Sequence, residues 1–153
     1  MTAPWTVVDG FGGSMRSISR VARPRTVEEL AQSLVQTRAA GQTVTLRGAG
    51  RSYGDAALHA GGLVLDTRRL DRVLSWDPER GILEAEPGLS IEGLWRHCIA
   101  DGWWPQVVPG TMVPTLGGCL AANVHGKNSF KVGPFGASVL DFDLLLANGE
   151  LRR

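Results

Sequence analysis

The hydrophobic pattern of the first 70 residues predicts short strands around one helix. Apolar side chains alternate with polar ones or form β-branched runs where strands are expected, and they recur every three to four residues where the helix is expected. Thr26 and Glu29 have the spacing of a capping box at the helix start, and Gly41 is a natural helix end. The predicted elements are a strand at 18–22, a helix from Val27 up to Gly41, a strand at 43–47 and a strand at 63–66. We therefore expect a first lobe of β-α-β-β order over about residues 16–68.

The rest of the chain, about residues 69–153, is expected to form a second lobe with a mixed or antiparallel sheet. The segments 72–76 and 82–86 flank a turn-forming stretch and predict a hairpin. Ser90 is expected to cap a helix that continues through Ile99. Together the two lobes predict an α+β fold class.

The last part of the chain predicts a strand followed by a tight turn. Val139–Ala147 reads as a strand, and Asn148-Gly149 is typical of a type I′ hairpin turn. Only four residues follow, fewer than the ~5–6 of an ordinary returning strand. We therefore expect a C-terminally truncated piece of a longer protein, with a short final edge strand as the alternative.

Composition narrows the function classes. The net charge is +1, so nothing favours a sequence-independent nucleic-acid binder, and no apolar run approaches the ~20 residues of a membrane span. No signal-peptide pattern is visible, which predicts a cytoplasmic protein. Cys98 and Cys119 fit no zinc-ligand spacing with the three histidines and are expected to be reduced, with a disulfide as the alternative.

Glycine is the unusual component. The chain has 20 glycines in 153 residues, nearly double the usual share, and they gather at 10–13, 48–62, 110–118 and 126–136. Clusters without a repeat indicate sharp turns or a close approach of the backbone to a ligand.

The first candidate site is the glycine-rich segment that follows the strand at 43–47. Such a loop can turn several main-chain N–H groups toward one point and form an anion-binding nest, and its arginines add positive charge. The residues expected there are Arg47, Gly48, Gly50, Arg51, Ser52, Tyr53 and Gly54. A Rossmann motif is rejected, because Tyr53 replaces the third glycine and the stretch before Leu63 is too short for a crossover helix. A plain surface loop remains the alternative.

The second candidate site contains two hydroxyl side chains and three glycines before a run of small residues. Thr115 can cap a helical turn whose N–H groups face a phosphate, whereas close helix packing at Gly117 and Gly118 is the structural alternative. Its residues are Pro109, Gly110, Thr111, Thr115, Gly117 and Gly118.

The third candidate site is the polar loop from Asn123 to Asn128. An imidazole, an ammonium group and two amides lie beside glycine, a combination that packing explains poorly. The loop is not a Walker A motif, because Ala121 stands where its first glycine is required and Asn128 replaces Ser or Thr.

In this order, the motifs resemble the FAD-binding (PCMH-type) domain of the vanillyl-alcohol-oxidase superfamily, above all its polyprenylphosphoryl-ribose oxidases of cell wall biosynthesis. The likeness runs from about Gly10 to the C-terminus. It implies a two-lobed domain with non-covalent FAD, because Asp55 stands at the position of the histidine that links the flavin in many relatives. It also implies a cap domain outside this chain, so the chain alone is expected to be inactive.

The resemblance assigns the diphosphate of FAD to the first loop and the isoalloxazine to the third. Lys127 and His125 are the candidate catalytic residues, Lys127 to steer an anionic substrate or stabilise negative charge and His125 to position groups. Asn123 departs from the acidic residue expected at its position. The further residues expected along the cofactor are Asn123, Val124, His125, Gly126 and Asn128.

The implied activity is oxidation of a hydroxyl-bearing carbon in a sugar-type substrate. The alternatives are an aldonolactone oxidase (like D-arabinono-1,4-lactone oxidase) or alditol oxidase, and a non-enzymatic module that binds a nucleotide or another anion. The expected partners are a small-molecule or lipid-linked sugar, a peripheral membrane contact of the full-length protein and a partner reductase, with no nucleic acid.

Overall fold

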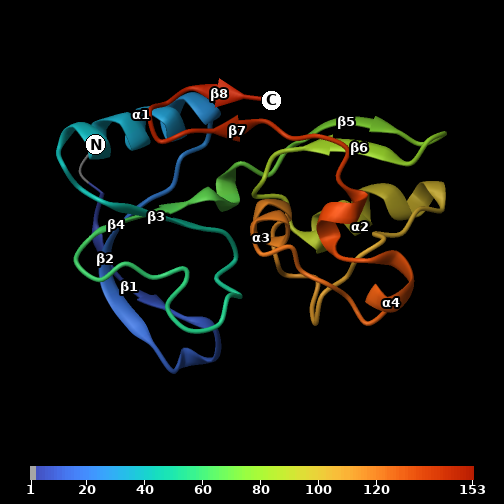
Figure 1. Cartoon of the computed structure of the whole chain (residues 1–153), viewed down its shortest axis with the longest axis horizontal. Coiled ribbons are helices and arrows are strands. Elements are labelled where there is room, and N and C mark those ends of the chain that lie inside the picture. Colours follow the sequence, from blue (N-terminus) through green and yellow to red (C-terminus); the bar gives the residue numbers. More distant parts are fainter. Residues whose placement is uncertain (1–2) are drawn as a thin grey trace. The chain divides into compact units, whose positions relative to one another are not determined.

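The computed structural model describes residues 3–153, which divide into two compact units (Figure 1). The first unit comprises the residues up to Arg69 together with Asp141–Arg153, and the second comprises Leu70–Leu140. The sequence pattern predicts residues 141–153 in the second lobe. They belong to the first unit because their turn packs on a helix there: a Cβ added at Gly149 would lie 2.8 Å from Cγ2 of Val35.

The first unit is built on a four-stranded mixed sheet in the order β1-β2-β4-β3. β1 pairs antiparallel with β2, whereas β2, β4 and β3 run parallel. The sequence analysis missed β1, so the expected β-α-β-β lobe gains a strand. β4 is buried along its whole length, which accounts for its continuous apolar run. The strands are β1 Trp5–Asp9, β2 Arg16–Ala22, β3 Val44–Arg47 and β4 Leu63–Asp66.

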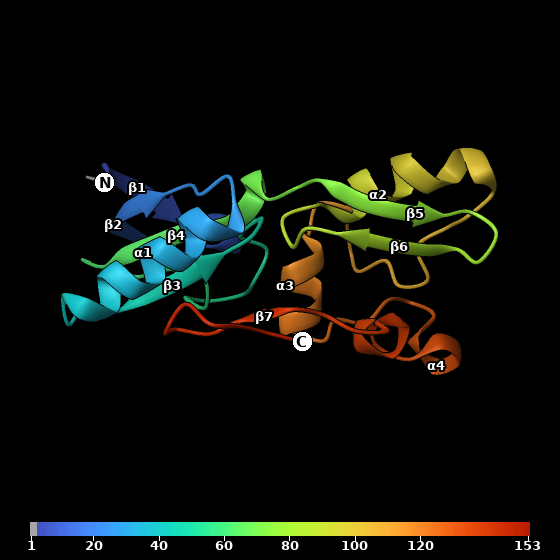
Figure 2. The same cartoon turned by 90° about the horizontal axis from the view of Figure 1, so that it is seen from above.

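Helix α1 (Val27–Ala39) lies along this sheet (Figure 2), and both of its ends are fixed by local hydrogen bonds. Thr26 Oγ1 accepts from the Glu29 N–H (3.2 Å), while the Glu29 carboxylate accepts from the Arg25 N–H (2.8 Å). At the other end Gly41 has a φ of +64°, and the N–H groups of Gly41 and Gln42 reach back to the Arg38 and Thr37 carbonyls. This is a Schellman motif, so the predicted start and end of the helix are confirmed.

Residues 48–62 connect two parallel neighbouring strands, β3 and β4, without a helix. The rejection of a Rossmann unit is therefore confirmed. The connection folds back over one face of the sheet, where Leu58 packs on Val8, Val21 and Val64. The glycine-rich loop thus begins at the end of β3, and its second half is held to the hydrophobic core by Leu58.

The C-terminal hairpin is much shorter than expected. Only Leu144–Leu145 (β7) and Leu151–Arg152 (β8) pair, so the strand predicted over residues 139–147 is wrong for most of its length. The turn also differs: Gly149 has a φ of +85°, Asn148 has no positive φ, and the Gly149 N–H bonds to the Leu146 carbonyl. This is a three-residue loop ending in a G1 bulge, not a type I′ turn.

The second unit has one two-stranded antiparallel sheet among its described residues, with short helices around it. The predicted hairpin and the Ser90 cap are confirmed, since Ser90 Oγ accepts from the Gly93 N–H at 3.0 Å. The strands and α-helices are β5 Val73–Asp77, β6 Ile82–Ala85, α2 Ile91–Cys98, α3 Leu116–Ala121 and α4 Ser129–Val132. Short 3-10 turns occur in both units at Phe11–Gly13, Thr67–Arg69, Ile99–Asp101 and Phe135–Ser138. None of the helices among residues 3–153 has the length and apolar character needed to cross a bilayer.

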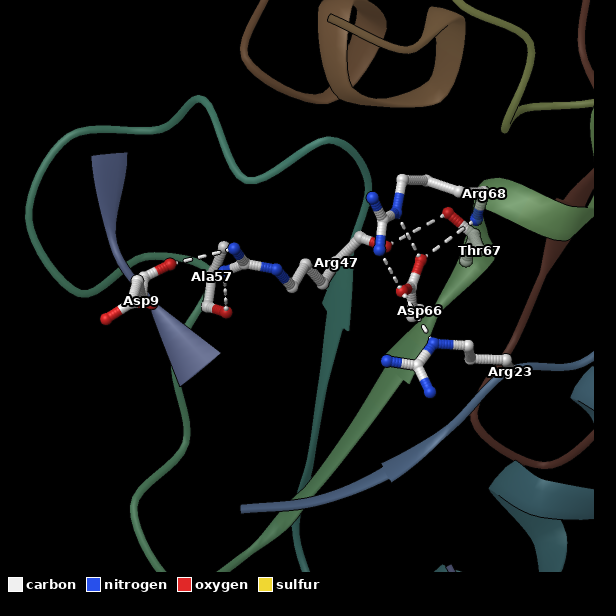
Figure 3. Close-up of polar contacts among 7 residues, drawn as sticks. All are labelled: Asp9, Arg23, Arg47, Ala57, Asp66, Thr67 and Arg68. Carbon is white, nitrogen blue, oxygen red and sulfur yellow. Dashed lines mark hydrogen bonds and ion pairs between the residues drawn. The ribbon is translucent and has the colours of Figure 1, made fainter. Parts of the chain in front are cut away.

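A buried carboxylate lies at the end of β4. Asp66 accepts from Arg68 Nη2 (2.6 Å) and Nε (2.9 Å) and from Arg23 Nε (3.3 Å) (Figure 3). Burial on its own raises the pKa of a carboxyl group, but the hydrogen bonds from Arg68 and Arg23 outweigh it and hold the pKa of Asp66 below its ordinary value. The carboxylate joins β4 to the turn after it and to the loop after β2.

We expect Asp66→Asn to lower the free energy of unfolding at pH 7 by about 2 kcal/mol, because the two arginines lose their charged acceptor. A lowered native pKa gives stability that is complete above the unfolded value of about 3.9 and is lost as the pH falls toward the native pKa. In urea titrations between pH 7 and pH 3, the free energy of unfolding should therefore fall less with decreasing pH in Asp66→Asn than in wild type. The exposed Asp143→Asn is the control, and an equal acid loss in all three proteins would contradict this role.

Candidate functional site

The loop after β3 offers unused main-chain donors. Among residues 3–153, none accepts a hydrogen bond from the N–H groups of residues 49–54. Gly50 and Gly54 have φ values of +65° and +64°, the left-handed conformation that turns successive amides toward one side. The first candidate site therefore has two features that an anion nest requires, unpaired amides and left-handed glycines.

The Arg47 side chain holds this loop from within. Its Nη1 donates to the Ala57 carbonyl (3.1 Å) and its Nη2 to the Asp9 carbonyl (2.8 Å), as Figure 3 shows. Burial lowers the pKa of Arg47, and the nearby Arg68 cation lowers it further, while Asp66 and Asp9 act in the opposite direction. Because both of these acceptors are neutral carbonyls, the guanidinium adds positive charge to the loop without a salt bridge of its own. Arg47 is thus an anchor of the loop, a role that the sequence analysis did not assign to it.

The tip of the loop carries three exposed side chains. Arg51, Ser52 and Tyr53 are exposed, and Tyr53 keeps 83% of its surface accessible. No carboxylate of residues 3–153 pairs with Arg51. These groups are available to a ligand.

In the second candidate site, the main-chain N–H groups at the start of α3 already have acceptors, whereas those of the preceding turn have none among residues 3–153. The first N–H groups of α3 are all used: Leu116 donates to the Leu89 carbonyl and Gly117 to the Pro87 carbonyl, both at 2.8 Å. Gly118 donates to Thr115 Oγ1 at 3.3 Å. A Cβ at Gly117 would lie 2.8 Å from Pro87 Cβ, so this glycine serves close packing. Thr115 does cap the helix as predicted, but this end has no free donor for a phosphate, and the packing alternative holds.

The Pro109-Gly110-Thr111 turn keeps unpaired main-chain donors. No residue in the described part of the chain accepts from the N–H groups of Gly110 and Thr111, and a Cβ at Gly110 would meet nothing within 4 Å. The fold itself does not require glycine there. The next residues anchor the turn, because the carbonyls of Met112 and Pro114 accept from the first N–H groups of α2.

The third candidate site lies against the residues just before the second. A Cβ at Gly126 would lie 2.8 Å from the Val108 carbonyl, and Asn128 Nδ2 donates to the Gln106 carbonyl at 3.1 Å. His125 and Lys127 remain exposed, and His125 makes one long contact, 3.5 Å, to the Gly126 carbonyl. The structure therefore places the His125–Asn128 loop beside the segment that leads into the 109–111 turn, within the second unit. Asn128 positions this loop with its side-chain amide.

Asn123 and Val124 end helix α3. Asn123 has a φ of +42°, and the N–H groups of Asn123 and Val124 bond to the Leu120 and Cys119 carbonyls in a second Schellman motif. Asn123 Oδ1 accepts from the Gly136 N–H at 2.9 Å, and the Val124 carbonyl accepts from the Phe135 N–H. The side chain of Asn123 therefore has a structural bond, whereas the resemblance implied a cofactor contact. The preference of Asn for the left-handed position after a helix was the signal available in the sequence.

No cluster of His, Cys, Asp or Glu within residues 3–153 is placed to hold a metal ion. Cys98 and Cys119 are separate, buried thiols, as expected. Burial raises the pKa of Cys119 to about 11, which makes it unreactive.

Sequence reasoning missed one group of residues at the first loop. Asp9, Gly10 and Phe11 contact it from the N-terminal turn. The glycine cluster at 10–13 was the only signal, and it does not indicate which segment the turn contacts.

The comparisons with known proteins agree on one family. Residues 18–153 match the family described as "FAD binding domain". The decaprenylphosphoryl-β-D-ribose oxidase of Mycolicibacterium smegmatis is 38% identical over 146 residues, which are 94% of this chain and 31% of that protein. An uncharacterized FAD-linked oxidoreductase of Mycobacterium tuberculosis is 32% identical over 133 residues, 86% of this chain and 29% of that protein. The chain thus spans about a third of the length of these curated relatives.

A solved structure shows the same fold. The crystal structure of 6-hydroxy-D-nicotine oxidase from Arthrobacter nicotinovorans superposes with a TM-score of 0.81 at 18% sequence identity. The match covers 99% of this chain and 36% of that one. The expected two-lobed α+β architecture is confirmed at the level of the fold.

Gly50 and Gly54 form a matched pair for testing the loop. A Cβ at Gly50 would overlap the Arg47 guanidinium, whereas a Cβ at Gly54 would meet nothing within 4 Å, and both residues have left-handed φ values. We expect Gly54→Ala to lower the free energy of unfolding by about 1 kcal/mol through backbone strain alone. Gly50→Ala should lower it by about 2–3 kcal/mol, because the hydrogen bonds of Arg47 are lost as well. Denaturant titration measures the difference, and equal losses would show that Arg47 does not hold the loop.

Proposed function

Because the chain belongs to the FAD binding domain family, we propose that its loop 47–54 holds the diphosphate of FAD without a covalent bond. The single observation that carries this proposal is the set of unpaired N–H groups at residues 49–54. Amides directed at an anion form charge-assisted hydrogen bonds, which are shorter and stronger than neutral ones. The third alternative from the sequence, a module without flavin, is set aside by the family.

The charges of this loop suit a diphosphate. The guanidinium of Arg47 lies under the loop, and that of Arg51 stands exposed at its tip. Ser52 Oγ adds a neutral donor beside them. A glycine at position 50 leaves room for Arg47, since any Cβ there would displace the guanidinium. The loop therefore supplies N–H donors and fixed positive charge without a metal ion.

The second unit has two segments with exposed groups of the kind that a cofactor uses. The N–H groups of Gly110 and Thr111 are free among the described residues, and the His125–Asn128 loop lies against Gln106 and Val108, just before that turn. Bound FAD supplies the acceptor for a hydride from a carbon that bears a hydroxyl group. Lys127 has an exposed ammonium group that can stabilise negative charge near the flavin or the substrate, and His125 orients groups there.

For the whole protein we propose an oxidoreductase that acts on a lipid-linked sugar. The support is the relative from M. smegmatis, whose name gives decaprenylphosphoryl-β-D-ribose as its substrate. A lipid-linked substrate in turn calls for a peripheral membrane contact of a cytoplasmic protein, and reoxidation of the flavin calls for an electron acceptor such as a partner reductase.

The experiment separates the diphosphate from the rest of the cofactor. The purified chain is titrated with FAD, FMN and riboflavin while flavin fluorescence and thermal shift are followed. We expect FAD to bind and riboflavin to bind at least tenfold more weakly, because riboflavin lacks the anion that the free amides recognise. If saturating FAD gives neither quenching nor a thermal shift, the proposed function is wrong.

Arg51→Gln tests the charge at the loop tip. We expect FAD binding to weaken by about fivefold to tenfold and to depend less on salt, because one exposed cation is removed. Riboflavin binding should not change. His97→Ala is the control, since His97 packs edge-on against Trp76 and belongs to none of the candidate sites. Equal losses for FAD and riboflavin would show that Arg51 does not act on the diphosphate.

A further inference from the structure

The N-terminal turn between β1 and β2 contacts the anion-binding loop at three points. The Asp9 carbonyl accepts from Arg47 Nη2, and a Cβ at Gly10 would lie 2.9 Å from the Gly54 carbonyl. The Phe11 ring meets the Tyr53 ring edge-on at 5.5 Å between centroids. These contacts link two segments about 40 residues apart in the sequence.

Phe11 contacts both long side chains at the tip of the loop. Besides Tyr53, the Arg51 guanidinium carbon lies 5.5 Å from the centroid of the Phe11 ring, the geometry of a cation–π contact. Gly12 and Gly13, with φ values of +81° and +71°, turn the chain directly after Phe11. The ring therefore contacts both of the long side chains that belong to the segment with the free amides.

We propose that Phe11 is a positioning residue for the diphosphate loop: its ring holds Arg51 and Tyr53 in place before the cofactor binds. The inference rests on the proposed function, because it assigns a purpose to the order of that loop. An exposed arginine has many rotamers, and fixing it beforehand lowers the entropic cost of binding. The aromatic ring supplies this restraint without a carboxylate, which would neutralise the charge that the diphosphate needs.

Three variants separate the ring from general packing. Phe11→Leu keeps an apolar side chain but removes the aromatic face, whereas Phe11→Tyr keeps the ring. Val7→Ala is the control, because Val7 lies in β1 with 57% of its surface exposed and its change leaves the turn intact. Nitrogen-15 relaxation of residues 49–54 in the cofactor-free chain reports on the loop itself, and titration with FAD reports on binding.

We expect Phe11→Leu to increase fast motion at residues 49–54 and to weaken FAD binding by roughly fivefold. Phe11→Tyr should keep the loop motion and the FAD affinity of the wild type, and Val7→Ala should change neither. A double-mutant cycle should give less than additive losses for Phe11→Leu with Tyr53→Leu, because both changes remove the same contact.

Unchanged relaxation in Phe11→Leu, or equal effects of Phe11→Leu and Val7→Ala, would overturn the inference. Failure of the wild-type chain to bind FAD would instead overturn the proposed function, while the relaxation data still decide whether Phe11 orders the loop.

Discussion

The loop between β3 and β4 is tied to the first unit by the two hydrogen bonds of the Arg47 guanidinium. By reaching the carbonyls of Asp9 and Ala57, one side chain closes a long loop between two parallel strands. The loop's own main-chain hydrogen bonds lie in its second half, where Leu58 donates to the Asp55 carbonyl and Gly62 to the His59 carbonyl. The first half is held by the Arg47 side chain instead, and the amides of residues 49–54 stay free among the described residues. Unpaired amides beside a guanidinium are what an anion-binding loop requires.

The two glycine-rich segments show that composition does not distinguish a loop with unpaired amides from a packing motif. Both 48–54 and 115–118 combine glycines with a hydroxyl side chain. In the second, each of the first amides of α3 already has an acceptor in the protein, and Gly117 is required by its contact with Pro87. The difference lies in the hydrogen-bond partners, which come from distant parts of the chain.

What could be predicted from the sequence is what local interactions decide. The caps at Thr26, Ser90 and Thr115 depend on an amide three residues away, and the buried strand β4 follows from its own apolar run. The missed features depend on distant partners. β1 becomes a strand by pairing with β2, and residues 139–143 do not pair although they look like a strand. Phe11 meets Tyr53 only because the turn after β1 folds against the loop. In the candidate site, the family motifs locate the loops. The fold decides which of their main-chain N–H groups stay without an acceptor.

The buried carboxylate of Asp66 fits the same electrostatic requirement. Arg47 and Asp66 are direct neighbours in the register of β3 and β4, at the carboxyl ends of parallel strands, where α/β folds commonly bind ligands. An unpaired carboxylate at this edge would repel a diphosphate. Arg68 and Arg23 both bond to Asp66, so its charge is balanced locally and the cation of Arg47 is left to act on the loop. A chain with a net charge of only +1 can thus present a positive site, because the position and pairing of a few side chains determine the local field, while the total charge does not.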